Sequence, residues 1–317
     1  MEEQSQPPTV PRRKILTGLA VAGGVSVAVV AGAYGVTELV KSTENPQSEP
    51  DIRSVFIGEP VPADDPDSRL WHRAPSQRVA LGGQNVIVPL KAEASLSDVK
   101  VRSIHDGKTI GFLLEWKDDA RDEHTIKTDS FRDACGVLLG PSGASPALWM
   151  MGTPDAPVTI LHWKADWQKD IDAGFQDLEV AFPNVAFDFY PPLVGVTNPK
   201  VPDDYPEETR NWLPGWHVGN PISQPVKTTP VEKLLGIGPG TLEHLPTQDA
   251  AGRGVWQNGR WKVVIASPMA VKDAGVTAIE PGQAYSTAFT VWSGADSDRG
   301  ARKSMTKLGQ VTLEPSA

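Results

Sequence analysis

Cysteine is nearly absent from this sequence, which has only Cys135 among its 317 residues. One cysteine excludes an internal disulfide and a zinc site built from several thiolates. The sequence also lacks a Cys-x-x-Cys-His motif, so any haem would be held without a covalent link. We expect Cys135 to be a small, buried, apolar side chain.

An excess of basic charge is missing as well. The chain carries 30 Lys and Arg against 39 Asp and Glu, for a net charge of −9. A nucleic-acid binder of this size would usually be basic, so we expect no nucleic-acid partner. The hydrolase and nucleotide-binding motifs Gly-x-Ser-x-Gly, His-Glu-x-x-His and the P-loop are absent. The six histidines never stand three or four residues apart, which gives no support to a helix-borne metal site.

Residues 15–40 are almost wholly apolar and small, with Glu38 as their single charge. A run of more than ~18 apolar residues can span a bilayer. Three cations precede it, Arg12, Arg13 and Lys14, and they predict a cytoplasmic N-terminus over residues 1–14. The remainder of the chain is then expected on the extracytoplasmic side, in the periplasm or its equivalent.

The start of this run resembles a twin-arginine (Tat) export signal, because an apolar pair follows Arg12 and Arg13. Residues 31–33, Ala-Gly-Ala, are typical of a signal-peptidase site. The sequence leaves two outcomes open, cleavage near Ala33 or a retained transmembrane helix. Residues 41–68 are rich in Pro, Ser, Asp and Glu and predict an extended linker.

The remaining residues, 69–317, predict an all-β domain. The chain contains 29 Pro and 29 Gly, which favours many short strands joined by turns. Asp106-Gly107 and Asn258-Gly259 predict two hairpins, because such pairs tolerate the positive φ of tight turns. The hairpins cover residues 99–116 and 254–266. Further strands are expected at 78–90, with a break at Gly82-Gly83, and at 158–163, 286–292 and 309–313. This pattern predicts a β-sandwich of the immunoglobulin-like or carbohydrate-module-like kind.

The strand pattern loosens between about residues 170 and 253, where the chain is rich in proline. A stretch of this length is too long for a plain loop in a compact domain. We expect a functional insertion that covers one end of the sandwich and contains a short helix at residues 230–235.

All ten Trp residues fall in this domain. Indole rings can line a carbohydrate cleft, pack against a large aromatic cofactor or fill a β core.

Several short segments together resemble one known family, the haem b-binding γ subunits of type II molybdenum enzymes, which include the ethylbenzene, dimethylsulfide, chlorate and selenate enzymes. Each segment is weak alone, but their order along the chain is specific. The segments are Phe-Leu-Leu-Glu-Trp at 112–116, Met-Gly at 151–152, His-Trp-Lys-Ala-Asp at 162–166, Gly-Asn-Pro-Ile-Ser at 219–223, Gly-Val-Trp-Gln-Asn-Gly-Arg-Trp at 254–261 and Trp-Ser-Gly-Ala at 292–295, followed by Arg-Gly-Ala-Arg-Lys-Ser at 299–304.

The resemblance implies a β-sandwich that holds one haem b between a methionine and a lysine. The corresponding residues are Met151 and Lys303, with Met150 as an alternative, because adjacent strand residues face opposite sides. Arg299 and Arg302 would oppose protonation of Lys303 or reach the haem propionates. Without the resemblance, core packing of the methionines and a solvated surface amine would be the expectation.

The resemblance further implies an electron-transfer subunit rather than a catalytic one, since two axial protein ligands leave no open position on the iron. Its partners would be a molybdenum catalytic subunit and an iron–sulfur subunit, and a soluble or membrane electron carrier would exchange electrons with it. Two alternatives stay open: an exported carbohydrate-binding module without haem, and an assembly subunit that has lost its haem.

Overall fold

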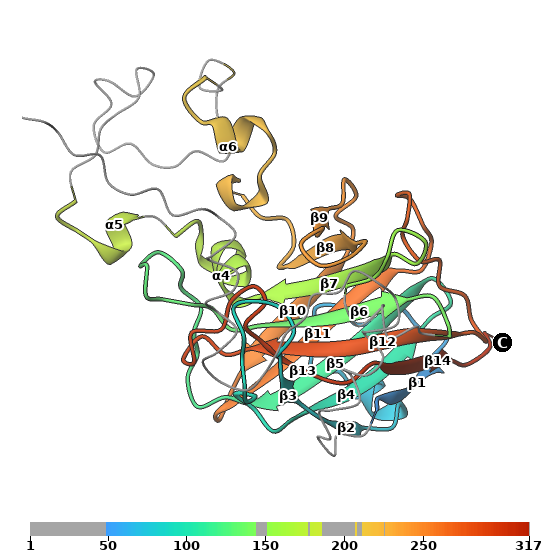
Figure 1. The fold of residues 1–317 in the computed structure, drawn as a ribbon. Coiled ribbons are helices and arrows are strands. Elements are labelled where there is room, and N and C mark those ends of the chain that lie inside the picture. The colour runs from blue at the N-terminus through green and yellow to red at the C-terminus, as the bar shows by residue number, and fades with distance from the viewer. Residues whose placement is uncertain are drawn as a thin grey trace, which may run out of the picture. The chain divides into compact units, whose positions relative to one another are not determined.

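The computed structural model describes residues 49–143, 151–176, 178–185, 207, 211–224 and 226–316 (Figure 1). The expected leader at residues 15–40, residues 41–48 of the expected linker, and Met150 lie outside the described residues. The extended linker predicted at residues 41–68 was wrong in part, because Asp51–Phe56 form strand β1, which pairs with two further strands as part of the sheet. In the part of the chain that is described, no helix combines the length and apolarity needed to cross a membrane.

The described part is mostly β. Fourteen of its strands join in one mixed sheet, ordered β10-β11-β5-β4-β1-β14-β12-β6-β7-β8-β9, with β2, β3 and β13 attached at the sides. The strands are β1 Asp51–Phe56, β2 Gln77–Ala80, β3 Gly82–Gly83, β4 Asp98–His105, β5 Thr109–Lys117, β6 Ala134–Gly140, β7 Val158–Lys164, β8 Val231–Gly236, β9 Glu243–His244, β10 Ala251–Trp256, β11 Arg260–Pro268, β12 Ala284–Trp292, β13 Ser304–Met305 and β14 Gly309–Leu313. The short helices are η3 Arg69–Arg73, α4 Ala165–Ala173, α5 Leu178–Ala181, α6 Pro214–His217 and η6 Pro221–Ser223.

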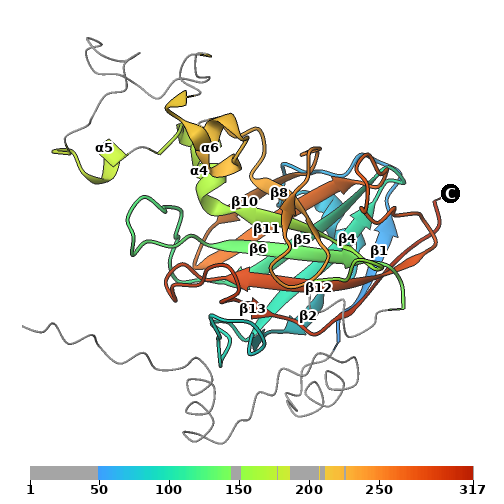
Figure 2. The same cartoon turned by 45° about the horizontal axis from the view of Figure 1, so that its top comes forward.

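The sheet folds into two facing layers, which confirms the predicted β-sandwich. Figures 1 and 2 show β12, β6 and β7 crossing over β11, β5 and β4. Aromatic rings from the two layers meet in the core: Phe112 and Phe289 have centroids 6.1 Å apart, and Trp163 and Trp261 have centroids 5.0 Å apart. The layers are joined through the parallel pairs that β1 makes with β4 and β14.

Both predicted hairpins are confirmed. In the second, Asn258 and Gly259 have φ of 53° and 68°, the left-handed pair that a two-residue turn requires. In the first, Asp106 Oδ1 accepts hydrogen bonds from the N–H groups of Lys108 and Thr109, at 2.8 and 2.7 Å, and so closes the turn.

The helix predicted at residues 230–235 was wrong, because this segment is strand β8. Its Glu, Lys and Leu residues favour a helix, but the segment pairs with β7 from Trp163↔Val231 to Val158↔Gly236. Backbone pairing and burial against a neighbouring strand outweigh local propensity here. The latter part of the expected insertion therefore belongs to the sheet.

The strand predicted at residues 78–90 is shorter than expected. It ends after β3, and the Gln84 side chain then organises a loop. Gln84 Oε1 accepts hydrogen bonds from the N–H groups of Val86 and Ile87, both at 2.6 Å. A side chain that satisfies backbone donors in this way replaces the pairing of a strand.

Core packing explains most of the tryptophans and the single cysteine. Cys135 is fully buried in the main core. Six indole side chains are also buried: Trp71, Trp116, Trp163, Trp167, Trp261 and Trp292. Exposed indoles of the kind that line a sugar cleft are therefore a minority of those described.

Gly254 offers a test of this packing, since a Cβ there would lie 2.3 Å from Cζ2 of Trp163. Trp163 is buried against Trp261 and cannot move away. We expect Gly254→Ala to lower the free energy of unfolding by about 1–3 kcal/mol, as overpacking does. Urea denaturation followed by Trp fluorescence measures it. Ala251→Ser adds one heavy atom at an exposed site of the same strand and should change stability by under ~0.5 kcal/mol; equal midpoints for the two variants would contradict the packing argument.

Candidate functional site

Strands β12, β6 and β7 are buried on both faces. In a two-layer sandwich the outer face of each layer is usually exposed to solvent, so this burial is unusual. One face belongs to the main core, and the other carries a second set of side chains, which we call the outer strip. Its members share the alternate register of the three strands: Ala134, Gly136 and Leu138; Ile160, His162 and Lys164; Ala288, Thr290 and Trp292.

The outer strip changes chemistry along its length. We call each set of three residues paired across the strands a rung. The first rung is apolar, with Ala288 opposite Leu138 and Leu138 opposite Ile160. The middle rung holds Thr290, Gly136 and His162, and the last holds Trp292, Ala134 and Lys164. The strip therefore runs from an apolar end to a basic, aromatic end.

Met151 packs at the apolar end, against the cluster that contains Leu138, Ile160 and Ala288. It lies in a turn before β7 rather than in a strand, with a φ of 71°, and its carbonyl accepts a hydrogen bond from the Gly238 N–H at 3.0 Å. Because Met151 is in a turn, the alternation argument that set it against Met150 does not apply to it. Met150 itself lies outside the described residues.

The glycine after Met151 is required by the backbone. Gly152 has a φ of 85°, and a Cβ there would lie 2.6 Å from the Gly236 carbonyl oxygen. Only glycine combines this conformation with so close an approach. The Met-Gly pair thus fixes the methionine side chain against the strip.

Lys303 lies at the other end of the strip, just before β13. Its Nζ is 5.3 Å from the centroid of the Trp292 ring. Burial lowers the pKa of the Lys303 amine to about 8. Burial disfavours the charged form, so an amine in this position gives up its proton far more readily than a solvated lysine.

Met151 and Lys303 thus contact the same face of the same sheet. The cluster against which Met151 packs includes Ala288 of β12, and Lys303 lies beside Trp292 of the same strand; these two positions are four residues apart, or about 13 Å along a strand. The interval between them is occupied by Thr290 with its neighbours in register, Gly136 and His162.

His162 is a site residue that the sequence did not single out. Its ring stacks on Trp292 with centroids 4.6 Å apart, and its Nε2 is buried without a hydrogen-bond partner among the described residues. Burial, followed by the charges of Lys164, Arg132 and Lys303, lowers the pKa of His162 well below its usual value. The ring is therefore neutral. The period of two that places His162 beside Ile160 and Lys164 was the only signal available.

A cavity of about 330 Å³ opens at the basic end of the strip. Its walls come from three places: the loop between β5 and β6, the outer strip, and the loop after β12. The lining residues are Thr125, Lys127, Thr128, Ser130, Phe131, Arg132, Ala134, His162, Trp292, Asp298, Arg299 and Gly300.

The two candidate arginines have different surroundings. Arg299 lines this cavity, with its guanidinium 4.7 Å from the centroid of the Phe131 ring. Arg302 is not among the lining residues. Its Nε lies 3.7 Å from Asp298 Oδ1, and its Nη1 donates to the Leu90 carbonyl at 3.4 Å. Of these two arginines, Arg299 is therefore the one placed to meet a group bound in the cavity.

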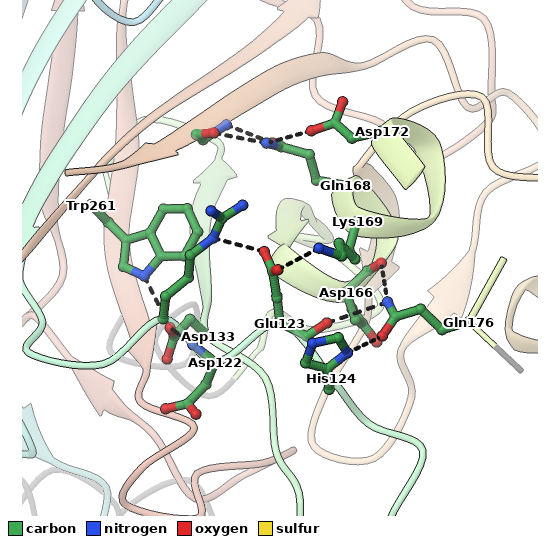
Figure 3. Close-up of polar contacts among 12 residues, drawn as sticks. Asp122, Glu123, His124, Asp133, Asp166, Gln168, Lys169, Asp172, Gln176 and Trp261 are labelled. Carbon is green, nitrogen blue, oxygen red and sulfur yellow. Dashed lines mark hydrogen bonds and ion pairs between the residues drawn. The ribbon is translucent and has the colours of Figure 1, made fainter. Parts of the chain in front are cut away.

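Helix α4 holds the loop that forms the cavity wall. Asp166 Oδ2 accepts hydrogen bonds from Arg132 Nη1 at 2.7 Å and from Thr125 Oγ1 at 3.0 Å. Figure 3 shows further links to the same helix, including the ion pair of Lys169 with Glu123 at 2.8 Å. These contacts anchor a long segment that has no strand or helix of its own.

Two buried carboxylates fix the loop after β12. Asp133 accepts from the N–H groups of Asp122 (2.8 Å) and Gly294 (2.9 Å) and from Trp261 Nε1 (2.9 Å). Asp298 pairs with Lys91 at 2.5 Å and accepts from the Ser293 N–H at 3.2 Å. Trp261, Gly294 and Lys91 lie 128, 161 and 207 residues from the carboxylates that they contact, so no local pattern could indicate these contacts.

The described residues contain no group of three or more His, Cys, Asp or Glu side chains able to hold a bare metal ion. What the site offers instead is a thioether, a readily deprotonated amine, a neutral imidazole and an arginine-lined cavity. These are ligands for a soft metal centre and partners for an organic anion.

A sequence profile described as ethylbenzene dehydrogenase matches residues 68–304. A chlorate reductase subunit gamma of Ideonella dechloratans is 24% identical over 301 residues, 93% of this chain and 94% of that protein. A protein of Haloferax mediterranei described as a respiratory nitrate reductase heme subunit is 20% identical over 273 residues, 86% of this chain and 76% of that protein.

Among solved structures, a family 9 carbohydrate-binding module of Caldicellulosiruptor kristjanssonii covers 84% of this chain and 95% of its own. The TM-score is 0.39 at 10% identity.

Asp133 provides a pH test of how the site is held together. Burial, followed by the charge of Asp118, raises the pKa of Asp133 from 3.8 to about 7. Between these values the folded chain keeps a proton that the unfolded chain has lost. The free energy of unfolding should therefore fall as pH rises from about 4 to about 7.

We expect Asp133→Asn to flatten this part of the stability profile, measured by urea denaturation at several pH values. Asp296→Asn, which removes an exposed carboxylate from the neighbouring loop, is the control and should keep the wild-type slope. Identical slopes in the wild type and in Asp133→Asn would show that Asp133 does not titrate in this range.

Proposed function

The chain belongs to the ethylbenzene dehydrogenase family, and from this membership we propose that it is the haem b-binding electron-transfer subunit of a molybdenum oxidoreductase. The family profile covers both candidate ligands. Two relatives that match most of this chain are described as a heme subunit and as a gamma subunit of nitrate and chlorate reductases. Electron transfer by a bound haem is the role that such names support.

Met151 and Lys303 are the axial ligands in this proposal. The observation that carries it is their contact with one face of one sheet, together with the burial of the Lys303 amine. A lysine ligates iron only as a neutral amine, and burial already lowers its pKa to about 8. A thioether is a soft, neutral donor that favours ferrous iron and so raises the reduction potential. The haem supplies one-electron transfer when it is bound.

The protein groups around these ligands complete the site. The apolar side chains of Leu138, Ile160 and Ala288 would exclude water from the Met151 side of the haem. Water stabilises the more highly charged ferric state, so its exclusion would raise the reduction potential. Trp292 stacks with His162 and contacts Lys303, so it holds both basic groups in place. Arg299 stands at the cavity as a partner for an anionic substituent.

The partners and location follow from the same proposal. The subunit would pass electrons between an iron–sulfur subunit and an extracytoplasmic carrier, and a molybdenum subunit would perform the catalysis. Export through the twin-arginine route, with the leader retained as an anchor or cleaved near Ala33, would place it on the extracytoplasmic side of the membrane.

The alternative, a carbohydrate-binding module, finds less support in the described residues. A sugar cleft needs exposed indole faces, whereas six tryptophans are buried and Trp212 is 45% exposed. Oligosaccharide-dependent Trp fluorescence in a haem-free preparation would favour this alternative.

An absorption spectrum of the purified full chain tests the proposal directly. We expect a Soret band and a pyridine haemochrome of the b type, with about one haem per chain. A preparation made with ample haem that shows neither feature would overturn the haem assignment.

Substitution of the ligands tests their identity. We expect Met151→Leu and Lys303→Gln each to weaken haem retention by roughly tenfold or more, since even the loss of an outer-shell partner costs 10–100-fold in metal affinity. Met151→Leu should also lower the potential, because it removes the thioether. Haem titration and potentiometry measure both effects.

Two matched variants control for general damage. Met269→Leu changes a methionine that is more deeply buried than Met151 and lies in the main core, and Lys108→Gln changes an exposed lysine. Neither should alter the affinity or the potential. A Lys303→Gln protein with the affinity and spectrum of Lys108→Gln would remove Lys303 from the ligand set.

A further inference from the structure

We propose that the cavity beside His162 binds the paired carboxylates of the haem, with Arg299 and Arg132 as charge partners and the His162 Nε2 as a hydrogen-bonding group. This inference rests on the proposed function and deepens it. It names the part of the protein that would orient the cofactor, and it separates Arg299 from Arg302.

The position of the cavity is the first argument. Trp292 lines the cavity, and the same ring contacts the Lys303 amine. A group held in the cavity is therefore next to the proposed iron ligand, as the substituents of a bound porphyrin would be. The volume of about 330 Å³ accommodates two carboxylate side chains with some water.

The charge of the lining is the second argument. Lys127, Arg132 and Arg299 supply three cations, whereas Asp298 supplies the single carboxylate. Asp298 is already paired with Lys91 at 2.5 Å and lies 3.7 Å from Arg302. Lys91 and Arg302 thus compensate the charge of Asp298. The cavity therefore presents an excess of positive charge to an incoming anion.

Arg132 and Arg299 also retain donors for such an anion. Arg132 uses Nη1 for Asp166, and Arg299 uses Nη1 for the Ser297 carbonyl. A guanidinium has five N–H donors in a fixed fork, so each side chain can still offer a further pair to a carboxylate. Asp166 and Phe131 hold the two planes in place before the anion binds.

His162 gives the third argument, and it is independent of charge. Its Nε2 is buried with no partner among the described residues, while the ring is fixed by stacking on Trp292. Buried polar atoms are nearly always hydrogen-bonded, so the His162 Nε2 at the wall of this cavity can take a partner from a group bound there. A neutral imidazole that carries its hydrogen on Nε2 would donate it to a carboxylate oxygen.

A matched pair of porphyrins tests the proposal on the full-length chain freed of haem. Haem and haem dimethyl ester share the iron and the macrocycle, but the ester lacks both carboxylates. Charge-assisted hydrogen bonds to a carboxylate are about twice as strong as those between neutral groups. We expect the wild-type chain to bind haem at least roughly tenfold more tightly than the ester, as measured by absorbance titration.

Substitutions of cavity residues should change the preference for haem over its dimethyl ester and leave the binding of the ester unchanged. Arg299→Gln changes an exposed side chain with little risk to folding, and His162→Phe keeps the stacking ring but removes Nε2. Both should narrow the preference for haem over its ester severalfold, and each should bind the ester as the wild type does. Arg302→Gln, three positions along the same loop and outside the cavity lining, should leave the preference unchanged.

The outcomes separate this inference from the proposed function. Equal binding of haem and ester by the wild type would overturn the carboxylate site while leaving a haem protein. Binding of neither porphyrin would overturn both. A calorimetric signal for sodium acetate that persists in the haem-loaded chain and disappears in Arg299→Gln would assign the cavity to a free anion, and would overturn the inference as well.

Discussion

The geometry of the site depends on the hydrogen bonds that the Asp133 carboxylate accepts. The carboxylate is fully buried, and it accepts hydrogen bonds from three segments: the loop before β6, the loop after β12 and strand β11 of the opposite layer. A buried carboxylate costs free energy unless its oxygens are satisfied, so these three segments must keep their mutual positions. Oδ2 accepts from the Asp122 N–H and from Trp261 Nε1, whereas Oδ1 accepts from the Gly294 N–H, so a shift of the loop after β12 would leave Oδ1 without its donor. The cavity walls and the approach to Lys303 are fixed by this requirement.

The two faces of one layer divide the work between stability and function. The inner face of β12, β6 and β7 packs aromatic and aliphatic groups, such as Phe289, Val137 and Trp163, into the main core. The outer face carries small or polar groups at the middle rung, Gly136, Thr290 and His162. A Cβ at Gly136 would lie 2.8 Å from Thr290 Oγ1, so the strip is tight at its centre. Because side chains alternate strictly along a strand, the inner face can satisfy the core while the outer face meets other demands.

The sequence was sufficient for the parts of the fold that depend on local chemistry. Asn258-Gly259 specified a turn because both residues needed positive φ, and the alternation around it specified the strands. The outer strip could not be predicted in the same way. The register that places His162 between Gly136 and Glu232 depends on three strands from distant parts of the chain. Segment 231–236 shows the limit most clearly, since helix-favouring residues became a strand through pairing with β7.

The candidate ligands were predictable only through resemblance to a family, and the reason is physical. Nothing local distinguishes Lys303 from a surface lysine; its character comes from burial beside Trp292, which the sequence does not contain. The same holds for Asp133 and for the Lys91–Asp298 pair, whose partners are 207 residues apart in the chain. Local sequence patterns therefore predicted the β scaffold, whereas the candidate site depends on contacts between residues that are far apart in the sequence.

The buried basic side chains at one end of the outer strip lower the stability of the folded domain. Burial lowers the pKa of Lys303 and of Lys164 to about 8 and that of His162 well below its usual value. Three such shifts on one face mean that the fold disfavours the charged state of three bases at once, which costs stability. Lys164 is partly compensated by Glu232 and by Trp167, whose ring centroid is 3.7 Å from its Nζ. Lys303 and the His162 Nε2 have no comparable compensation among the described residues, and strongly perturbed bases beside a cavity are typical of functional sites. A cofactor that takes a neutral amine as a ligand and offers an acceptor to a buried imidazole would relieve both costs, which is why a haem suits this face better than an empty cleft does.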